Sequence, residues 1–138
     1  MNAAIEVKNL RCEFRVHDGI LKAEKRVIAV DDVTFSVPAG SVLGIVGESG
    51  CGKSTLARAL VRLLTCDEGK VLFGGEDIAT FSGTVRRDFN RRVQMIFQDP
   101  YSSLNPRMTV RQVLTEALSV HKMRPRSEIG ARIAELLD

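Results

Sequence analysis

The sequence lacks any apolar run long enough to cross a membrane. A spanning helix needs roughly 20 apolar residues, whereas a typical apolar run here covers only residues 42–46. Residues 1–6 carry neither the basic flank nor the hydrophobic segment of a secretory signal peptide. Internal repeats and low-complexity tracts are absent as well. These absences argue against membrane-embedded, secreted and repeat proteins, and we expect a globular chain.

A strong net charge and closely spaced cysteine pairs are also missing. The net charge of +3 at pH 7 is too small to indicate nucleic-acid binding by itself. The three cysteines (Cys12, Cys51 and Cys66) are odd in number and show no C-x-x-C spacing. We therefore expect them to be reduced thiols in a cytosolic protein. With 138 residues, 44% of them apolar and 27% charged, the chain has the composition of one globular domain.

One stretch carries recognisable chemistry. Residues 47–55 read GESGCGKST, which matches the phosphate-loop pattern G-x-x-x-x-G-K-[ST] (Walker A) without a gap. They follow the apolar run 42–46, which predicts a buried strand, and precede residues 56–64, which predict a helix. A glycine-rich turn with a surface lysine is the alternative, but the strand–loop–helix context favours a site for a nucleoside triphosphate.

Each residue type in this loop has a physical reason. Glycines allow positive φ and let backbone N–H groups surround a polyphosphate, while the following helix directs its positive end at the same anion. Lys53 supplies a charge for the β- and γ-phosphates, Ser54 a hydroxyl ligand for Mg²⁺, and Thr55 could reach an α-phosphate oxygen. The predicted binding residues are Gly47, Ser49, Gly50, Cys51, Gly52, Lys53, Ser54 and Thr55.

The rest of the chain predicts an α/β fold with a strand-rich first part. Before the loop, apolar alternation predicts antiparallel strands at 5–14, 27–30 and 33–37, with a polar excursion at 18–26. After it we predict a strand and turn at 70–75, a helix at 84–92 and a strand at 93–97. Two further helices are predicted, one opened by a capping box at Thr109 and one starting near Ser127.

The second half of the sequence narrows the range of protein families to which the chain could belong. Residues 95–110, MIFQDPYSSLNPRMTV, together with the phosphate loop and residues 29–35, AVDDVTF, resemble an ATP-binding subunit of the ABC transporters. More narrowly, they resemble the oligopeptide/dipeptide (peptide/nickel) importer branch, along essentially the whole chain. The resemblance implies a P-loop NTPase core of the ABC type. It divides the chain into an antiparallel β layer (1–40), the P-loop core (41–97), and the Q-loop with the start of the helical subdomain (98–138).

The resemblance also implies roles for individual residues, with ATP and Mg²⁺ as cofactors. Gln98 matches the Q-loop glutamine, which in this family contacts Mg²⁺ or the attacking water and links the γ-phosphate to the membrane partner. Phe14 matches the aromatic residue that stacks on adenine, although a Phe on an alternating strand can also belong to the core. Lys53 and Gln98 are thus the implied catalytic residues, and Ser54 and Gln98 the implied metal ligands.

Several family motifs have no counterpart here. The LSGGQ signature, the second acidic strand with its catalytic glutamate, and the switch histidine are not matched, and we interpret His17 and His121 as surface residues. In the family these motifs lie C-terminal to the matched region, and the last predicted helix stops at Asp138 without a cap. We therefore interpret the chain as the N-terminal portion of such a subunit, binding ATP but hydrolysing it inefficiently alone.

The implied function is to power the import of peptides or similar small solutes. The implied partners are transmembrane permease subunits, a second ATPase subunit (identical or different) and, indirectly, an extracytoplasmic solute-binding protein, but no nucleic acid. The implied location is peripheral, on the cytoplasmic face of the inner (plasma) membrane. A nickel or glutathione importer, a non-catalytic nucleotide-binding or docking module, and a stand-alone P-loop kinase remain alternatives. A kinase would need lid arginines, which could be Arg86, Arg87, Arg91 and Arg92. The preferred interpretation is that these arginines form a solvated helix face.

Overall fold

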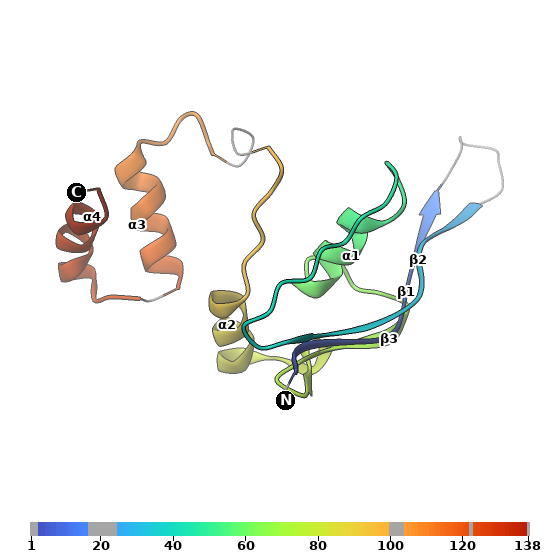
Figure 1. Cartoon of the computed structure of the whole chain (residues 1–138). Helices are drawn as coiled ribbons and strands as arrows, with labels where there is room; N and C mark the ends of the chain where they lie inside the picture. Colours follow the sequence, from blue (N-terminus) through green and yellow to red (C-terminus); the bar gives the residue numbers. More distant parts are fainter. Residues whose placement is uncertain (1–2, 17–24, 100–103, 122, 138) are drawn as a thin grey trace. The chain divides into compact units, whose positions relative to one another are not determined.

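The computed structural model describes residues 3–16, 25–99, 104–121 and 123–137 (Figure 1). They form two compact units, Met1–Met95 and Ile96–Asp138, and each is described by itself. His17, interpreted as a surface residue, and most of the predicted excursion at 18–26 lie outside the described residues, as do residues 100–103. Among the helices that the structure describes, none is long and apolar enough to span a bilayer.

A four-stranded antiparallel sheet forms the base of the first unit, in the order β2-β1-β3-β4. The strands are β1 (Ala3–Val16), β2 (Lys25–Pro38), β3 (Glu68–Phe73) and β4 (Glu76–Asp77). This confirms the predicted antiparallel β layer, and β3 and β4 with their connecting turn confirm the strand predicted at 70–75. The two segments predicted at 27–30 and 33–37 are one strand, β2, whose pairing with β1 is interrupted by register shifts.

Irregular residues in β1 and β2 are held by side-chain hydrogen bonds. Asn9 and Asp32 both have φ of 46°, and the Asn9 amide donates to Asp32 Oδ1 at 2.8 Å. On the same ribbon, Arg11 donates to Glu13 and to Asp31. The hydrogen bond with Glu13, and the carboxylate charges of Asp31 and Glu13, raise the pKa of Arg11 above its ordinary value. Polar side chains therefore stabilise the long β1–β2 ribbon where its backbone hydrogen-bond ladder is irregular.

Two helices and a 3₁₀ turn complete the core of the first unit. They are α1 (Lys53–Leu60), η1 (Ile78–Thr80) and α2 (Gly83–Arg92). Phe89 of α2 packs edge-to-face on Phe73 and Phe81, with ring centroids 5.4 and 5.5 Å apart. The buried residues of this core are Val7, Leu10, Cys12, Val30, Leu56, Ala59, Val71, Ile78, Phe81 and Phe89.

The helix predicted at 56–64 ends earlier than expected. The residue after its C-cap, Arg62, has φ of 59°, and its guanidinium donates to the carbonyl oxygens of Phe81 and Ala79 at 2.6 and 3.0 Å. A left-handed residue cannot continue an α-helix. The chain therefore turns at Arg62, where α1 is tied to the η1 segment. The arginines at 86, 87, 91 and 92 are exposed on α2, as a solvated helix face requires.

Two predicted strands are wrong for the chain as described. Residues 42–46 and 93–97 contain no strand, and the side chains of Val42, Val46 and Ile96 are 97%, 95% and 95% exposed. A strand exists only where its backbone groups pair with a neighbour. The four strands among the described residues pair only with one another, so these two apolar runs have no partner. Apolar composition alone therefore predicted strands at two segments that do not join the sheet.

The second unit is a pair of helices, α3 (Val110–Val120) and α4 (Ile129–Leu137), with the 3₁₀ turn η2 (Arg126–Glu128) leading into α4. Thr109 forms the predicted capping box, its hydroxyl accepting from Gln112 N and its N–H donating to Gln112 Oε1. The core of this unit consists of Leu118, Ile129 and Ile133, with Leu114 against them. Both predicted helices are confirmed.

Candidate nucleotide-binding site

The glycine loop leads directly into the N-terminus of α1. Gly50 and Gly52 have φ of 83° and 97°, which only glycine adopts without strain. Cys51 N donates to Glu48 O at 3.3 Å, closing a turn, and Leu56 N donates to Gly52 O at 2.9 Å, beginning the helix. The loop backbone therefore curves as the phosphate-loop pattern predicts, although no strand precedes it.

Two glycines of the loop have close neighbours, and at Gly52 the neighbour is backbone, so glycine is required there. A Cβ placed on Gly47 would lie 2.6 Å from Cys51 Sγ, inside the curve of the loop. A Cβ on Gly52 would overlap the carbonyl oxygen of Ala29 and would also meet Val30. Gly52 thus rests directly on strand β2. The sequence does not predict this support, because nothing in an alternating strand indicates which carbonyl a distant loop will approach.

Lys53 folds back over the loop. Its ammonium group donates to the carbonyl oxygens of Gly47 and Glu48, both at 2.7 Å, and lies 3.5 Å from Cys51 Sγ. Within the described residues these contacts are made to neutral groups rather than to a carboxylate. The positive charge is therefore available to an anion that enters the loop.

The N-terminus of α1 is also suited to an anion. Among the described residues no side chain caps α1 at Gly52, and its first turn contains no acidic residue. Its N–H groups therefore keep their partial positive charge. Ser54 is exposed and Thr55 half-buried on this first turn. The positive-φ glycines, the lysine and the uncapped helix together fit a polyphosphate.

A magnesium ion would draw few ligands from this loop. The Ser54 hydroxyl is the hard oxygen donor that the pattern supplies, and no group of three or more His, Cys, Asp or Glu side chains among the described residues could hold a metal. Mg²⁺ typically keeps waters and phosphate oxygens alongside one or two protein ligands. The residues present fit an ion that arrives with the nucleotide.

Phe14 lies on β1, two residues beyond the buried Cys12, and is paired with Val27 of β2. Its side chain is 38% exposed and belongs to neither core cluster. Gly52 contacts β2 at Ala29, close along the ladder to the Phe14–Val27 pair. Phe14 is therefore accessible at the part of the ribbon that supports the loop, and its stacking role stays a prediction.

Gln98 is described with the second unit, where it is exposed at a bend. The phosphate loop belongs to the first unit. The predicted residues from Gly47 to Thr55 all belong to the first unit, whereas Gln98 belongs to the second. The role of Gln98 therefore stays a prediction.

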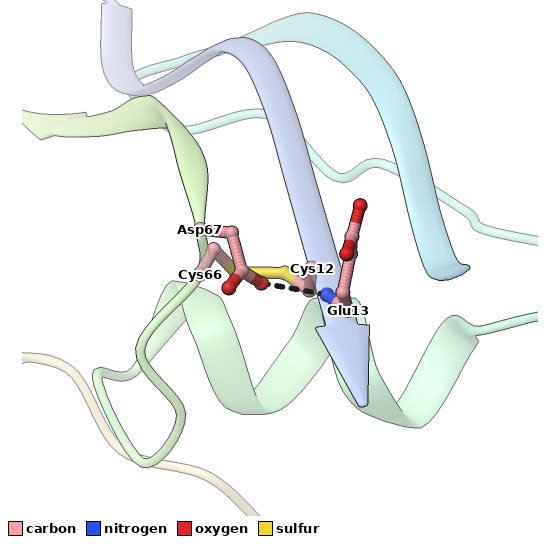
Figure 2. Close-up of a disulfide and its surroundings, with 4 residues drawn as sticks. All are labelled: Cys12, Glu13, Cys66 and Asp67. Carbon is pink, nitrogen blue, oxygen red and sulfur yellow. Dashed lines mark hydrogen bonds between the residues drawn. A yellow bond between two sulfur atoms is a disulfide. The ribbon is translucent and has the colours of Figure 1, made fainter. Parts of the chain in front are cut away.

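The expectation of three reduced thiols requires correction. Cys12 of β1 and Cys66, six residues after α1, form a disulfide across 54 residues of sequence (Figure 2), and Cys51 is free and exposed. Counting cysteines and their local spacing could not detect this pair, because packing of α1 on the sheet brings the two residues together. The sequence feature that could have indicated a buried Cys12 was its position between Leu10 and Phe14 on an apolar-alternating strand.

Comparisons with known proteins identify the family of this chain. The family model described as ABC transporter matches residues 30–138. The oligopeptide transport ATP-binding protein OppF of Bacillus subtilis is 46% identical over 97% of this chain and 43% of its own length. The glutathione import ATP-binding protein GsiA of Escherichia coli K12 is 42% identical over 97% of the chain and 22% of its own length.

A solved structure, cbiO1 from Clostridium perfringens, part of the ABC transporter complex cbiONQ, matches the fold with a TM-score of 0.67. The match has 23% sequence identity and covers 99% of this chain and 50% of that one. This likeness supports the fold alone. The chain thus spans half or less of the length of these known proteins.

Proposed function

Since the chain belongs to the ABC transporter family, we propose that it binds ATP at residues 47–55 as part of an ATPase that powers import of peptides or glutathione. The observation that carries this proposal is the loop itself. Gly50 and Gly52 have positive φ, Lys53 lies over the loop carbonyls, and the uncapped α1 begins beside it. This arrangement would hold the phosphate chain of a nucleotide.

We propose a role for each loop residue from its position. The Lys53 ammonium would exchange its two carbonyl acceptors for the β- and γ-phosphate oxygens, neutralising charge there. Ser54 would give its hydroxyl to Mg²⁺, and backbone N–H groups of the loop and the first turn of α1 would bind phosphate oxygens. Bound Mg²⁺ would supply charge neutralisation between the phosphates.

The central test is titration of the chain with a fluorescent ATP analogue and Mg²⁺. Lys53→Ala should weaken binding about 10- to 100-fold, because a hydrogen bond between two charged groups contributes about 1.5–3 kcal/mol. Arg58→Ala is the matched control, since Arg58 is an exposed cation on the same helix. Equal affinities of wild type and Lys53→Ala, with unchanged circular dichroism, would contradict the proposal.

The adenine contact is proposed for Phe14 and is tested by changing the ligand. Phe14→Ala should weaken ATP binding about 10-fold or more, since aromatic stacking on a base contributes about 1–3 kcal/mol. Binding of inorganic tripolyphosphate, which has no base, should not change. Equal losses for both ligands would indicate a damaged loop instead of a lost stacking partner.

Gln98 is proposed to contact Mg²⁺ or the attacking water, and residues from Gln98 onward to meet the permease. The amide is a neutral ligand, so Gln98→Ala should weaken MgATP binding less than Lys53→Ala does. The same titration with EDTA in place of Mg²⁺ should remove the difference between Gln98→Ala and wild type. A difference that persists in EDTA would contradict metal contact and leave the attacking water as the partner of Gln98.

Transport itself is proposed for the assembly of this subunit with a second ATPase subunit and permease subunits, peripheral on the cytoplasmic face of the membrane. Named relatives act in oligopeptide transport and glutathione import, which supports these substrate classes. We further propose that this chain alone hydrolyses ATP slowly, since the signature motif and catalytic glutamate are not matched in it. Steady hydrolysis by the purified chain, abolished by Lys53→Ala, would contradict this.

A further inference from the structure

We propose that Cys12 and Cys66 form a reversible thiol–disulfide switch that sets the nucleotide affinity of the loop, with Cys66 as the sulfur that external thiols attack. The pair lies outside the loop, on β1 and on the segment that follows α1. The effect on nucleotide binding rests on the proposed function. The switch itself rests only on the geometry around the two sulfurs.

Polar contacts hold the two cysteines together independently of the sulfur bond. The residue after Cys66, Asp67, donates its N–H to Arg11 O at 2.9 Å. Its carboxylate accepts from Glu13 N at 2.7 Å (Figure 2). Asp67 is thus hydrogen-bonded to the residues on both sides of Cys12, whose Cα lies 4.4 Å from that of Cys66. Reduction would leave the thiols adjacent, so the bridge can reform.

The two cysteine residues differ in exposure. Cys12 is 1% exposed in the core, whereas Cys66 is half-buried and lines a pocket of about 150 Å³ together with Arg62 and Lys70. Attack on a disulfide requires access to one sulfur, and nearby cations favour an approaching thiolate. Cys66 Sγ is therefore the attacked sulfur and Cys12 Sγ the leaving group.

The exchange is balanced with a small dithiol as reductant and a small disulfide as oxidant. One reductant thiolate bonds to Cys66 Sγ, the Cys12–Cys66 bond breaks, and Cys12 leaves as a thiolate that takes a proton. The second reductant thiolate then displaces Cys66 and closes the reductant's own disulfide. In the reverse direction, a disulfide such as oxidised glutathione accepts both electrons and leaves as two thiols.

The bridge is connected to the loop through β2. Cys12 pairs with Val30, and Val30 together with the Ala29 carbonyl forms the surface on which Gly52 rests. The ring closed by the bridge contains β2, the phosphate loop and α1. Opening it releases a constraint on both the support and the helix of the loop. The oxidised chain should therefore bind nucleotide more tightly.

The test compares the full chain after treatment with oxidised glutathione and after a dithiol, in a Cys51→Ser background that removes the free thiol. Because Cys51 lies in the predicted binding loop, nucleotide affinities are compared only between the oxidised and reduced states of this same variant. Oxidation should protect both remaining cysteines from alkylation. Reduction should lower the melting temperature by about 10 °C or more and weaken ATP-analogue binding at least about 5-fold. With Cys12→Ser, glutathione should attach to Cys66, whereas with Cys66→Ser it should not attach to Cys12.

The outcomes separate this inference from the proposed function. Failure of the bridge to form, or equal melting temperatures of the two states, overturns the switch whatever the chain binds. Attachment of glutathione to Cys12 in preference to Cys66 overturns the order of attack. A bridge that forms and stabilises the fold but leaves nucleotide affinity unchanged overturns the coupling. Absence of nucleotide binding by the wild-type chain and by both states of the variant, with the thermal shift intact, refutes the proposed function while the bridge stands.

Discussion

The two compact units of this chain contain helices of similar length that are stabilised by different means. In the first unit, α1 and α2 contribute to a core of ten buried residues over a hydrogen-bonded sheet, reinforced by the Cys12–Cys66 bridge. In the second unit, α3 and α4 share three buried residues. Burial of apolar area sets most of the stability of a packed helix, so the second unit should open first.

This difference has a functional meaning. The phosphate loop rests on the better-packed unit, where Gly52 meets β2 and needs a fixed support. Gln98 and the following residues belong to the weaker unit. Elements that move during function are typically drawn from the less stable parts of a fold. We therefore expect ATP binding to depend on the first unit, and movement to be concentrated in the second.

The largest effect should come from removing the aromatic centre of the first unit. Phe89→Ala should lower the free energy of unfolding by about 3–5 kcal/mol, because Phe89 is 2% exposed between two aromatic rings. Urea denaturation followed by circular dichroism measures the loss. Val85→Ala is the matched control on the same helix, since Val85 is 50% exposed. Equal losses for the two variants would contradict the assignment of this core.

A smaller and local effect is expected in the second unit. Ile133→Ala should remove about 2–4 kcal/mol of local stability, because Ile133 is 2% exposed between α3 and α4. Hydrogen exchange should show lost protection in α3 and α4 with unchanged protection in β1 and β3. Leu137→Ala, at a 60% exposed position of the same helix, is the control. Loss of protection throughout the sheet would show that the units are not independent.

The smallest effect concerns the cap of α3. Thr109→Ala should cost about 1 kcal/mol, because it removes the hydroxyl that accepts from Gln112 N. In a unit with a small core this loss should still be visible as faster exchange in the first turn of α3. Thr109→Ser keeps the hydroxyl and should behave like wild type. A deficit of the same size in both variants would show that the methyl group, and not the cap, is responsible.

Local rules predicted a large part of the fold. The capping box at Thr109, the helix at 84–92 and the alternation of β1 each depend on residues close in sequence, and the structure contains all three. The rules failed at 42–46 and 93–97, where strand formation depends on partners far along the chain. They also failed at Cys12 and Cys66, because 54 residues separate them and only packing of α1 against the sheet brings them together.

The sequence by itself determined the phosphate loop, the helix after it and the family, since a glycine pattern acts through the backbone within a few residues. Tertiary structure decided what the loop rests on. The Ala29 carbonyl under Gly52 and the bridge from Cys12 to Cys66 follow from the packing of α1 on β1 and β2. Backbone conformation is a local property, whereas close approach between distant segments is settled only when the core is packed.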